Sequence, residues 1–164
     1  MILSGESKIA IEAKFTEYTP KGEGTAKPIS QWKNEGSSKE NRELVLQYWT
    51  QLIQPFSKGI DLDLVSDVEY QFYHRTASAC KDAGKAFVVY QVFYDEQTVA
   101  YLSSYKEKLE AYVKIINPNE QLNFYLWEIE TFQKIHERAD ENPFVEMKNK
   151  NVYEFGKTNL HKLH

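Results

Sequence analysis

Two apolar stretches in the middle of the chain constrain its fold most strongly. Residues 85–95 (KAFVVYQVFYD) are apolar at almost every position and rich in β-branched and aromatic residues, and residues 122–132 (LNFYLWEIETF) are expected to form a second buried strand. Such runs are typical of central strands that are buried on both faces of a sheet covered by helices. They predict an α/β fold, in which a central mixed sheet is flanked by helices.

A third strand is expected near the start of the chain, where residues 7–16 read SKIAIEAKFT. The alternation of apolar and polar residues puts Ile9, Ile11, Ala13 and Phe15 on one face, which we expect to be buried. Glu12 and Lys14 then project together from the other face, roughly 7 Å apart along the strand. The simplest interpretation is an ion pair on a half-solvated strand, and the alternative is a hydrolytic metal site.

Helical patterns separate the strands. We expect helices at residues 37–53, 64–83 and 95–116, and a short polar helix near residues 133–140. Ser37 and Glu40 form a capping-box pattern at the start of the first helix, and Asn117-Pro118-Asn119 should end the third helix. Because strands alternate with helices, part of the sheet should be parallel.

The chain should form a single domain over residues 1–164, since 164 residues are too few for two comfortable domains. Residues 18–38, rich in Gly, Pro, Ser and Lys, are expected to be a long flexible loop, and residues 151–164 a loosely ordered tail. No helix or hairpin is expected before the first strand, so the sheet should be incomplete at its N-terminal side.

Composition limits the cellular compartment and the kinds of binding partner that we expect. The chain has one cysteine, Cys80, which we expect to be a small core residue; the absence of a disulfide framework fits the cytoplasm. We see no signal peptide, and no apolar stretch approaches the roughly 20 residues that cross a bilayer. The net charge of −4 argues against a surface uniformly basic for nucleic acid, so any phosphate-binding surface must be local.

The segment Ile11-Glu12-Ala13-Lys14-Phe15 resembles the second half of the PD-(D/E)-x-K motif of the restriction-endonuclease-like nuclease superfamily. The order of elements over roughly residues 7–130 is also similar to the core of that superfamily. The resemblance implies a restriction-endonuclease-like fold and a DNA nuclease that depends on Mg²⁺ or Mn²⁺. It implies that Glu12 and the backbone carbonyl of Ala13 bind the metal ion and that Lys14 assists the transition state.

Further residues have expected roles in the same reading. Glu17 could add a second carboxylate to the catalytic group. On the predicted second helix, Gln71, Arg75 and Ser78 share one face and could approach the phosphates of DNA, with Arg75 as a bidentate clamp. A solvated polar face is the alternative interpretation of these three residues.

The sequence departs from the superfamily pattern at one position, because no aspartate occurs before Asp61 and only Glu6 is acidic upstream of Glu12. Three explanations are open. The chain is the C-terminal part of a longer protein, or it is a catalytically inactive relative that binds, or a carboxylate such as Asp61, Asp63 or Asp67 has taken the place of the aspartate.

Two functions therefore remain. The first is a metal-dependent DNA nuclease-like domain that is truncated or inactive in this form. The second is a non-catalytic binding protein on the same fold, which pairs with a second copy or a partner chain through an exposed sheet edge.

Overall fold

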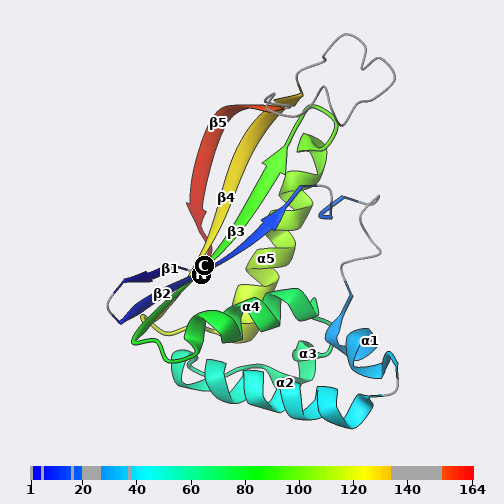
Figure 1. The fold of residues 1–164 in the computed structure, drawn as a ribbon, viewed down its shortest axis with the longest axis vertical. Coiled ribbons are helices and arrows are strands. Elements are labelled where there is room, and N and C mark those ends of the chain that lie inside the picture. The colour runs from blue at the N-terminus through cyan, green and yellow to red at the C-terminus, as the bar shows by residue number, and fades with distance from the viewer. Residues whose placement is uncertain (1, 5, 16, 20–26, 37, 134–152) are drawn as a thin grey trace, which may run out of the picture.

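The computed structural model describes residues 2–4, 6–15, 17–19, 27–36, 38–133 and 153–164, which form a five-stranded mixed sheet with helices against it (Figure 1). The strands are β1 (Ile2–Ser4), β2 (Ser7–Lys14), β3 (Lys85–Tyr94), β4 (Leu122–Gln133) and β5 (Tyr153–Lys162). The helices are α1 (Ile29–Asn34), α2 (Lys39–Ile53), α3 (Leu62–Val65), α4 (Tyr70–Cys80) and α5 (Leu102–Ile116), with short 3-10 turns η2 (Gln54–Phe56) and η3 (Val99–Tyr101).

The strands lie in the sheet in the order in which they occur in the chain. β2, β3 and β4 are parallel, and the edge strands β1 and β5 are antiparallel to their neighbours. Parallel neighbours need a crossover, and α4 and α5 lie in the two crossovers that connect β2 to β3 and β3 to β4. The expected α/β fold with a central mixed sheet is confirmed.

The helices that contact the sheet lie on one of its faces. The ring centroids of Phe72 on α4 and Tyr90 on β3 are 5.1 Å apart, and those of Tyr112 on α5 and Phe124 on β4 are 5.8 Å apart. α2 packs on α4, where the hydroxyls of Thr50 and Tyr73 are 2.9 Å apart. The core therefore lies between α4, α5 and the face of the sheet that carries Tyr90 and Phe124.

The buried face of β2 is the opposite of the one that we expected. Ala10, Glu12 and Lys14 are buried, whereas Ile9 and Ile11 are half-buried and Ala13 is exposed. α4 contacts β2 from the side of Glu12 and supplies polar partners there. Because those partners satisfy both charged groups, the charged face can be buried and the more apolar face left partly open.

The same alternation continues in β3, which we expected to be buried on both faces. Ala86, Val88, Tyr90 and Val92 are buried beneath the helices, while the residues between them are only half-buried. Among the described residues no helix covers that second face. The expectation of burial on both faces is therefore wrong for β3.

Both ends of the chain are more regular than we expected. β1 forms an antiparallel hairpin with the first residues of β2, from the pair Ile2 and Ile9 to the pair Ser4 and Ser7, so the expected absence of a hairpin is wrong. The tail forms β5, which pairs with β4 along most of its length. The largely polar sequence of this segment, YEFGKTNLHK, did not indicate a strand.

The helix boundaries differ in three places. The predicted loop at residues 18–38 contains α1, whose Trp32 stacks between Trp49 and Tyr70. The predicted helix at 64–83 is divided into α3 and α4, and the helix predicted from residue 95 begins regularly only at Leu102. The predicted helix that became α2 and the predicted helix end at Asn117 are confirmed. Ser37 and the helix expected near residues 133–140 lie outside the described residues, except for Gln133, which ends β4.

Candidate phosphate-binding site

Four polar side chains converge where α4 crosses β2. Glu12 and Lys14 project from β2 toward α4, and Gln71 and Arg75 project from successive turns of α4 toward the strand. We call these four residues the β2–α4 cluster. Spacing of i and i+4 puts Gln71 and Arg75 on the same helix face, and spacing of i and i+2 puts Glu12 and Lys14 on the same strand face.

The contacts within the cluster join strand and helix directly. One carboxylate oxygen of Glu12 lies 2.5 Å from Nη2 of Arg75, and the other lies 3.6 Å from Nζ of Lys14. The Lys14 ammonium also donates to Oε1 of Gln71. The side chain of Lys14 is only 3% exposed, whereas that of Arg75 is 34% exposed, so Arg75 is partly open to solvent.

The charges of the cluster do not fit a resident divalent cation. Glu12 is the one carboxylate in it, and both of its oxygens face a positively charged group. Mg²⁺ needs several oxygen ligands in octahedral geometry, and a neighbouring lysine and arginine repel it. In the part of the chain that the structure describes, no three residues of the types His, Cys, Asp and Glu come together as a metal site. The cluster carries a net charge of +1, which favours an anion.

The other predicted catalytic and phosphate-binding residues are not in this cluster. Glu17 accepts a hydrogen bond from the backbone N–H of Phe15 at 2.8 Å, which closes a local turn after β2. Ser78 donates to the backbone carbonyl of His74 within α4 at 2.9 Å. Ala13 exposes its side chain on the opposite face of the sheet, and its backbone lies between Glu12 and Lys14. None of these positions adds a carboxylate ligand beside Glu12.

The acidic residues that we considered as substitutes for the missing aspartate lie elsewhere. Asp61 caps α3, where its carboxylate accepts from the backbone N–H of Leu64 at 3.4 Å. Asp63 and Asp67 are exposed, as is Asp61. No contact among the described residues joins any of the three to Glu12. The explanation in which one of these carboxylates completes a metal site therefore finds no support in the geometry.

Sequence reasoning missed the buried polar residues beside the cluster. Glu69, directly before α4, is 5% exposed and pairs with Lys108 of α5. Tyr90 lies opposite Glu12 in the register of β2 and β3, and its hydroxyl is buried, as is that of Tyr105 on α5. The helix predicted from residue 64 would contain Glu69, so the sequence did not single out this residue. The two tyrosines belonged to apolar stripes, which indicate a core and give no sign of where a hydroxyl points.

Burial perturbs the ionisable groups around the cluster. It raises the pKa of Tyr90 and of Tyr105, and the neighbouring Tyr90, Glu69, Glu12 and Glu17 raise the pKa of Tyr105 further, so both hydroxyls stay protonated. Burial also lowers the pKa of His74, with Arg75 acting in the same direction. The neutral tyrosine hydroxyls are therefore available as hydrogen-bond donors beside Glu12.

Cys80, at the last turn of α4, is buried as expected. Its residue surface is 3% exposed, and burial raises the pKa of its thiol to about 12. A thiol in such surroundings stays protonated at neutral pH and is a poor nucleophile. The prediction of a small core residue at position 80 is confirmed.

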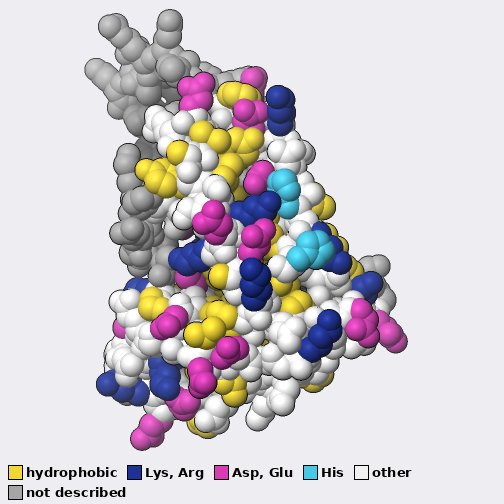
Figure 2. Space-filling model, turned by 180° about the vertical axis from the view of Figure 1, so that it is seen from behind, with side chains coloured by type: hydrophobic (Ala, Val, Ile, Leu, Met, Phe, Trp, Pro, Cys, Tyr) yellow, Lys and Arg dark blue, Asp and Glu magenta, His cyan; other side chains and the backbone are white. Residues whose placement is uncertain are grey.

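On the side of the described residues that is seen from behind, the charged surface gives no second candidate. Seen from behind, acidic and basic side chains are interspersed over the molecule, without a continuous basic patch on that side (Figure 2). His161, which we assigned to the tail, lies on β5 with its Nε2 atom 3.1 Å from the carboxylate of Glu128. A phosphate-binding site must therefore rest on few cationic groups, as the net charge of the chain indicated.

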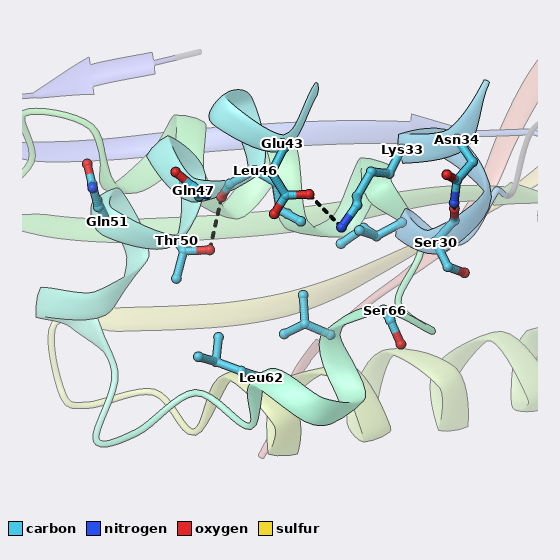
Figure 3. A pocket seen from close by; sticks show the side chains of 12 residues that line it. Ser30, Lys33, Asn34, Glu43, Leu46, Gln47, Thr50, Gln51, Leu62 and Ser66 are labelled. Atoms are coloured by element: carbon cyan, nitrogen blue, oxygen red, sulfur yellow. Dashed lines mark hydrogen bonds and ion pairs between the residues drawn. The ribbon is translucent and has the colours of Figure 1, made fainter. Parts of the chain in front are cut away.

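A hollow of about 580 Å³ lies between α1, α2 and the region of α3 (Figure 3). Three of its polar side chains have partners within the lining, because Lys33 pairs with Glu43 at 2.5 Å and the Thr50 hydroxyl donates to the carbonyl of Leu46 at 2.9 Å. No member of the β2–α4 cluster lines it. The hollow therefore offers no chemistry comparable to that of the cluster.

The chain belongs to the family described as a domain of unknown function (DUF6946), which matches residues 2–134. This range includes β1 to β4, all the helices between them and the whole β2–α4 cluster, whereas β5 follows it. No curated protein and no solved structure matches the chain. Any statement about function must therefore be built on the chemistry of the cluster.

Proposed function

We propose that this chain is a nuclease-like domain that binds phosphodiester groups of DNA at the β2–α4 cluster without cleaving them. The observation that carries the proposal is the convergence of Lys14, Gln71 and Arg75 around a single carboxylate, Glu12. Lysine and arginine are the side chains that proteins use to hold phosphate, and Gln71 can hold the lysine in place.

The absence of cleavage follows from the same contacts. In the nuclease reading, Glu12 binds Mg²⁺ or Mn²⁺, but here Arg75 and Lys14 occupy both of its oxygens. A metal ion would have to displace Arg75 and would then find one carboxylate from the cluster. We therefore assign Glu12 the role of holding Lys14 and Arg75 in place for a phosphate, and derive no step through a metal ion.

Binding is tested with a covalently closed plasmid in a mobility-shift titration at two salt concentrations. We expect the protein to bind, and Arg75→Gln to weaken binding by about tenfold, because one charge-assisted contact is lost. The affinity should also depend less on salt in Arg75→Gln. Arg42→Gln is the matched control, since Arg42 lies over the ring of Trp32 at 5.3 Å and outside the cluster. Equal affinities of the two variants would contradict the proposal.

Cleavage is tested on the same plasmid with Mg²⁺ or Mn²⁺, beside Glu12→Ala and Lys14→Ala. We expect no nicking above that of the variants. Nicking by the unchanged protein that disappears in both variants would establish a metal-dependent nuclease in place of a binding domain. Nicking that persists in both variants would show that cleavage does not use this site.

The second candidate function is pairing through a sheet edge, and one observation favours it. β5 is an edge strand, and its Phe155 and Leu160 are 68% and 62% exposed. Unpaired backbone groups and exposed apolar side chains on an edge strand favour the addition of another strand. Light scattering at high concentration tests this function, and a strict monomer would count against self-association through β5.

A further inference from the structure

Three buried polar atoms beside Glu12 have no hydrogen-bond partner among the described residues: Nε of Arg75 and the hydroxyls of Tyr90 and Tyr105. Tyr90 is 0% exposed and Tyr105 is 4% exposed. A buried polar group without a partner destabilises the fold, so native proteins rarely keep several of them in one place. Their occurrence together indicates a ligand or ordered water.

The three atoms belong to one region of the interior. Tyr90 is paired with Glu12 across β2 and β3, and Glu12 contacts Arg75. The ring of Phe72, one turn before Arg75 on α4, packs against Tyr90 at 5.1 Å and against Tyr105 at 6.0 Å. Phe72 therefore contacts both tyrosines, and Arg75 follows it by three residues on the same helix.

The hydrogen-bonding capacity of this region selects an acceptor. Nε of an arginine can only donate, and the Lys14 ammonium has three hydrogens, of which one is used by Gln71 and another is directed to Glu12 at 3.6 Å. A tyrosine hydroxyl can donate as well. Since the cluster also has a net charge of +1, the group that fits these donors is an oxyanion.

Burial decides which form of phosphate fits. A phosphodiester inside a DNA strand has two sugars attached, so it can contact Arg75, which is 34% exposed, but its free oxygens cannot reach Lys14, which is 3% exposed. A terminal phosphomonoester has three free oxygens and is attached to a single sugar. That sugar can extend into solvent on the side where Arg75 is exposed. Its second negative charge also suits two cationic side chains better than a diester does.

We propose that Lys14, Arg75, Tyr90 and Tyr105 form a binding site for a terminal phosphomonoester, supplied by the phosphorylated end of a nucleic acid or by free phosphate. Arg75 and Lys14 provide the charge, and the two tyrosine hydroxyls donate to oxygens on the inner side of the phosphate. This inference rests on the proposed function because it uses the same cluster, and it adds a deeper position that only the end of a strand or free phosphate can reach.

The experiment measures binding of three probes by calorimetry: inorganic phosphate, a 5′-phosphorylated oligonucleotide, and the same oligonucleotide with a 5′-hydroxyl. We expect the phosphorylated oligonucleotide to bind at least tenfold more tightly than the hydroxyl form. Tyr90→Phe and Tyr105→Phe should each weaken phosphate binding by about tenfold, as expected for a lost hydrogen bond to a charged group. Tyr101→Phe is the matched control, since Tyr101 is 38% exposed.

The thermal stability of the ligand-free variants separates binding from structure. Removal of an unpartnered buried hydroxyl should leave the melting temperature of Tyr90→Phe and Tyr105→Phe unchanged or raise it. Weaker phosphate binding together with a lower melting temperature would instead reveal hydroxyls that are structural, satisfied by internal water, and would overturn the inference. Unchanged phosphate binding in both variants would also overturn it.

The probes separate this inference from the proposed function. Preference for the phosphorylated end supports both the inference and nucleic acid as the source of the phosphate. Binding of inorganic phosphate without any preference between the oligonucleotides supports the site with free phosphate as its ligand, and contradicts the proposed function. Tight binding of a closed plasmid with no binding of phosphate or of the phosphorylated end supports the proposed function and overturns the inference.

Discussion

At the scale of single residues, the carboxylate of Glu12 holds together two positive charges, one of them almost completely buried. It compensates Lys14 from the same strand and Arg75 from α4. Removal of one partner from a buried ion pair is strongly destabilising, because the remaining charge is left without compensation. Glu12 is therefore important for stability.

We predict that Glu12→Gln lowers the free energy of unfolding by about 3 kcal/mol, the lower end of the range for buried pairs, since Arg75 can turn toward water. Glu35→Gln is the control, because Glu35 forms a 2.8 Å ion pair with Lys27 in which both side chains are more than a third exposed. That substitution should cost much less, because solvent screens an exposed pair. Urea denaturation measures both, and equal losses would contradict the assigned role of Glu12.

The site shows at the same scale how far single residues could be interpreted from the sequence. Glu12, Lys14, Gln71 and Arg75 were recognised because their spacings place them on one strand face and one helix face. Glu69, Tyr90 and Tyr105 were not, since their hydrogen-bonding state depends on neighbours that are distant in the chain. Local periodicity predicts which side chains share a face, but what that face contacts depends on tertiary packing.

At the scale of elements, α5 ends where the sequence predicted, in a residue with left-handed backbone geometry. Asn117 has φ of 47° and ψ of 63°, and its N–H donates to the carbonyl of Val113. Asparagine tolerates this geometry better than most residues, and glycine adopts it without steric cost. The end of the helix is therefore fixed by the backbone of one position.

We predict that Asn117→Gly leaves the free energy of unfolding unchanged within about 0.5 kcal/mol or raises it, whereas Asn117→Val lowers it by about 1–2 kcal/mol. The β-branched side chain of valine clashes in the left-handed region, where glycine has no Cβ atom. Thermal or urea denaturation of the two variants at one position tests this, and equal stabilities would show that the cap is not under conformational constraint.

The strands show where elements could not be predicted in full. The alternation in residues 7–14 identified β2, but the apolar residues Ile9 and Ile11 pointed to the wrong buried face. A strand whose charges are all paired by a helix reverses the usual assignment, and no pattern within the strand signals it. β5 was missed for a related reason, because an exposed edge strand has no need of an apolar face.

At the scale of the whole molecule, the described chain is a two-layer structure with helices on one face of the sheet. Val88 and Val89 are neighbours on β3 that point to the two faces: Val88 is 0% exposed beneath the helices, and Val89 is half-buried on the other side. Among the described residues, no helix is long and apolar enough to cross a membrane. The asymmetry between the two faces is the main property of this architecture.

We predict that Val88→Thr lowers the free energy of unfolding by about 1–3 kcal/mol, because its hydroxyl replaces a methyl group in a dry interior. Val89→Thr should cost less than half as much, since water reaches that face. The substitution is nearly isosteric and β-branched in both variants, so strand propensity cancels. Urea denaturation compares them, and a larger loss for Val89→Thr would indicate that the second face is covered in solution.

The burial of Cys80 gives this architecture an internal reporter. The sequence contains one cysteine, and it lies at the end of α4, the helix that covers Glu12 and Lys14. Because the sulfur is buried, we expect a thiol-reactive dye to reach it when the end of α4 opens. The labelling rate would therefore measure how often α4 opens, and a ligand at the proposed site should slow the labelling.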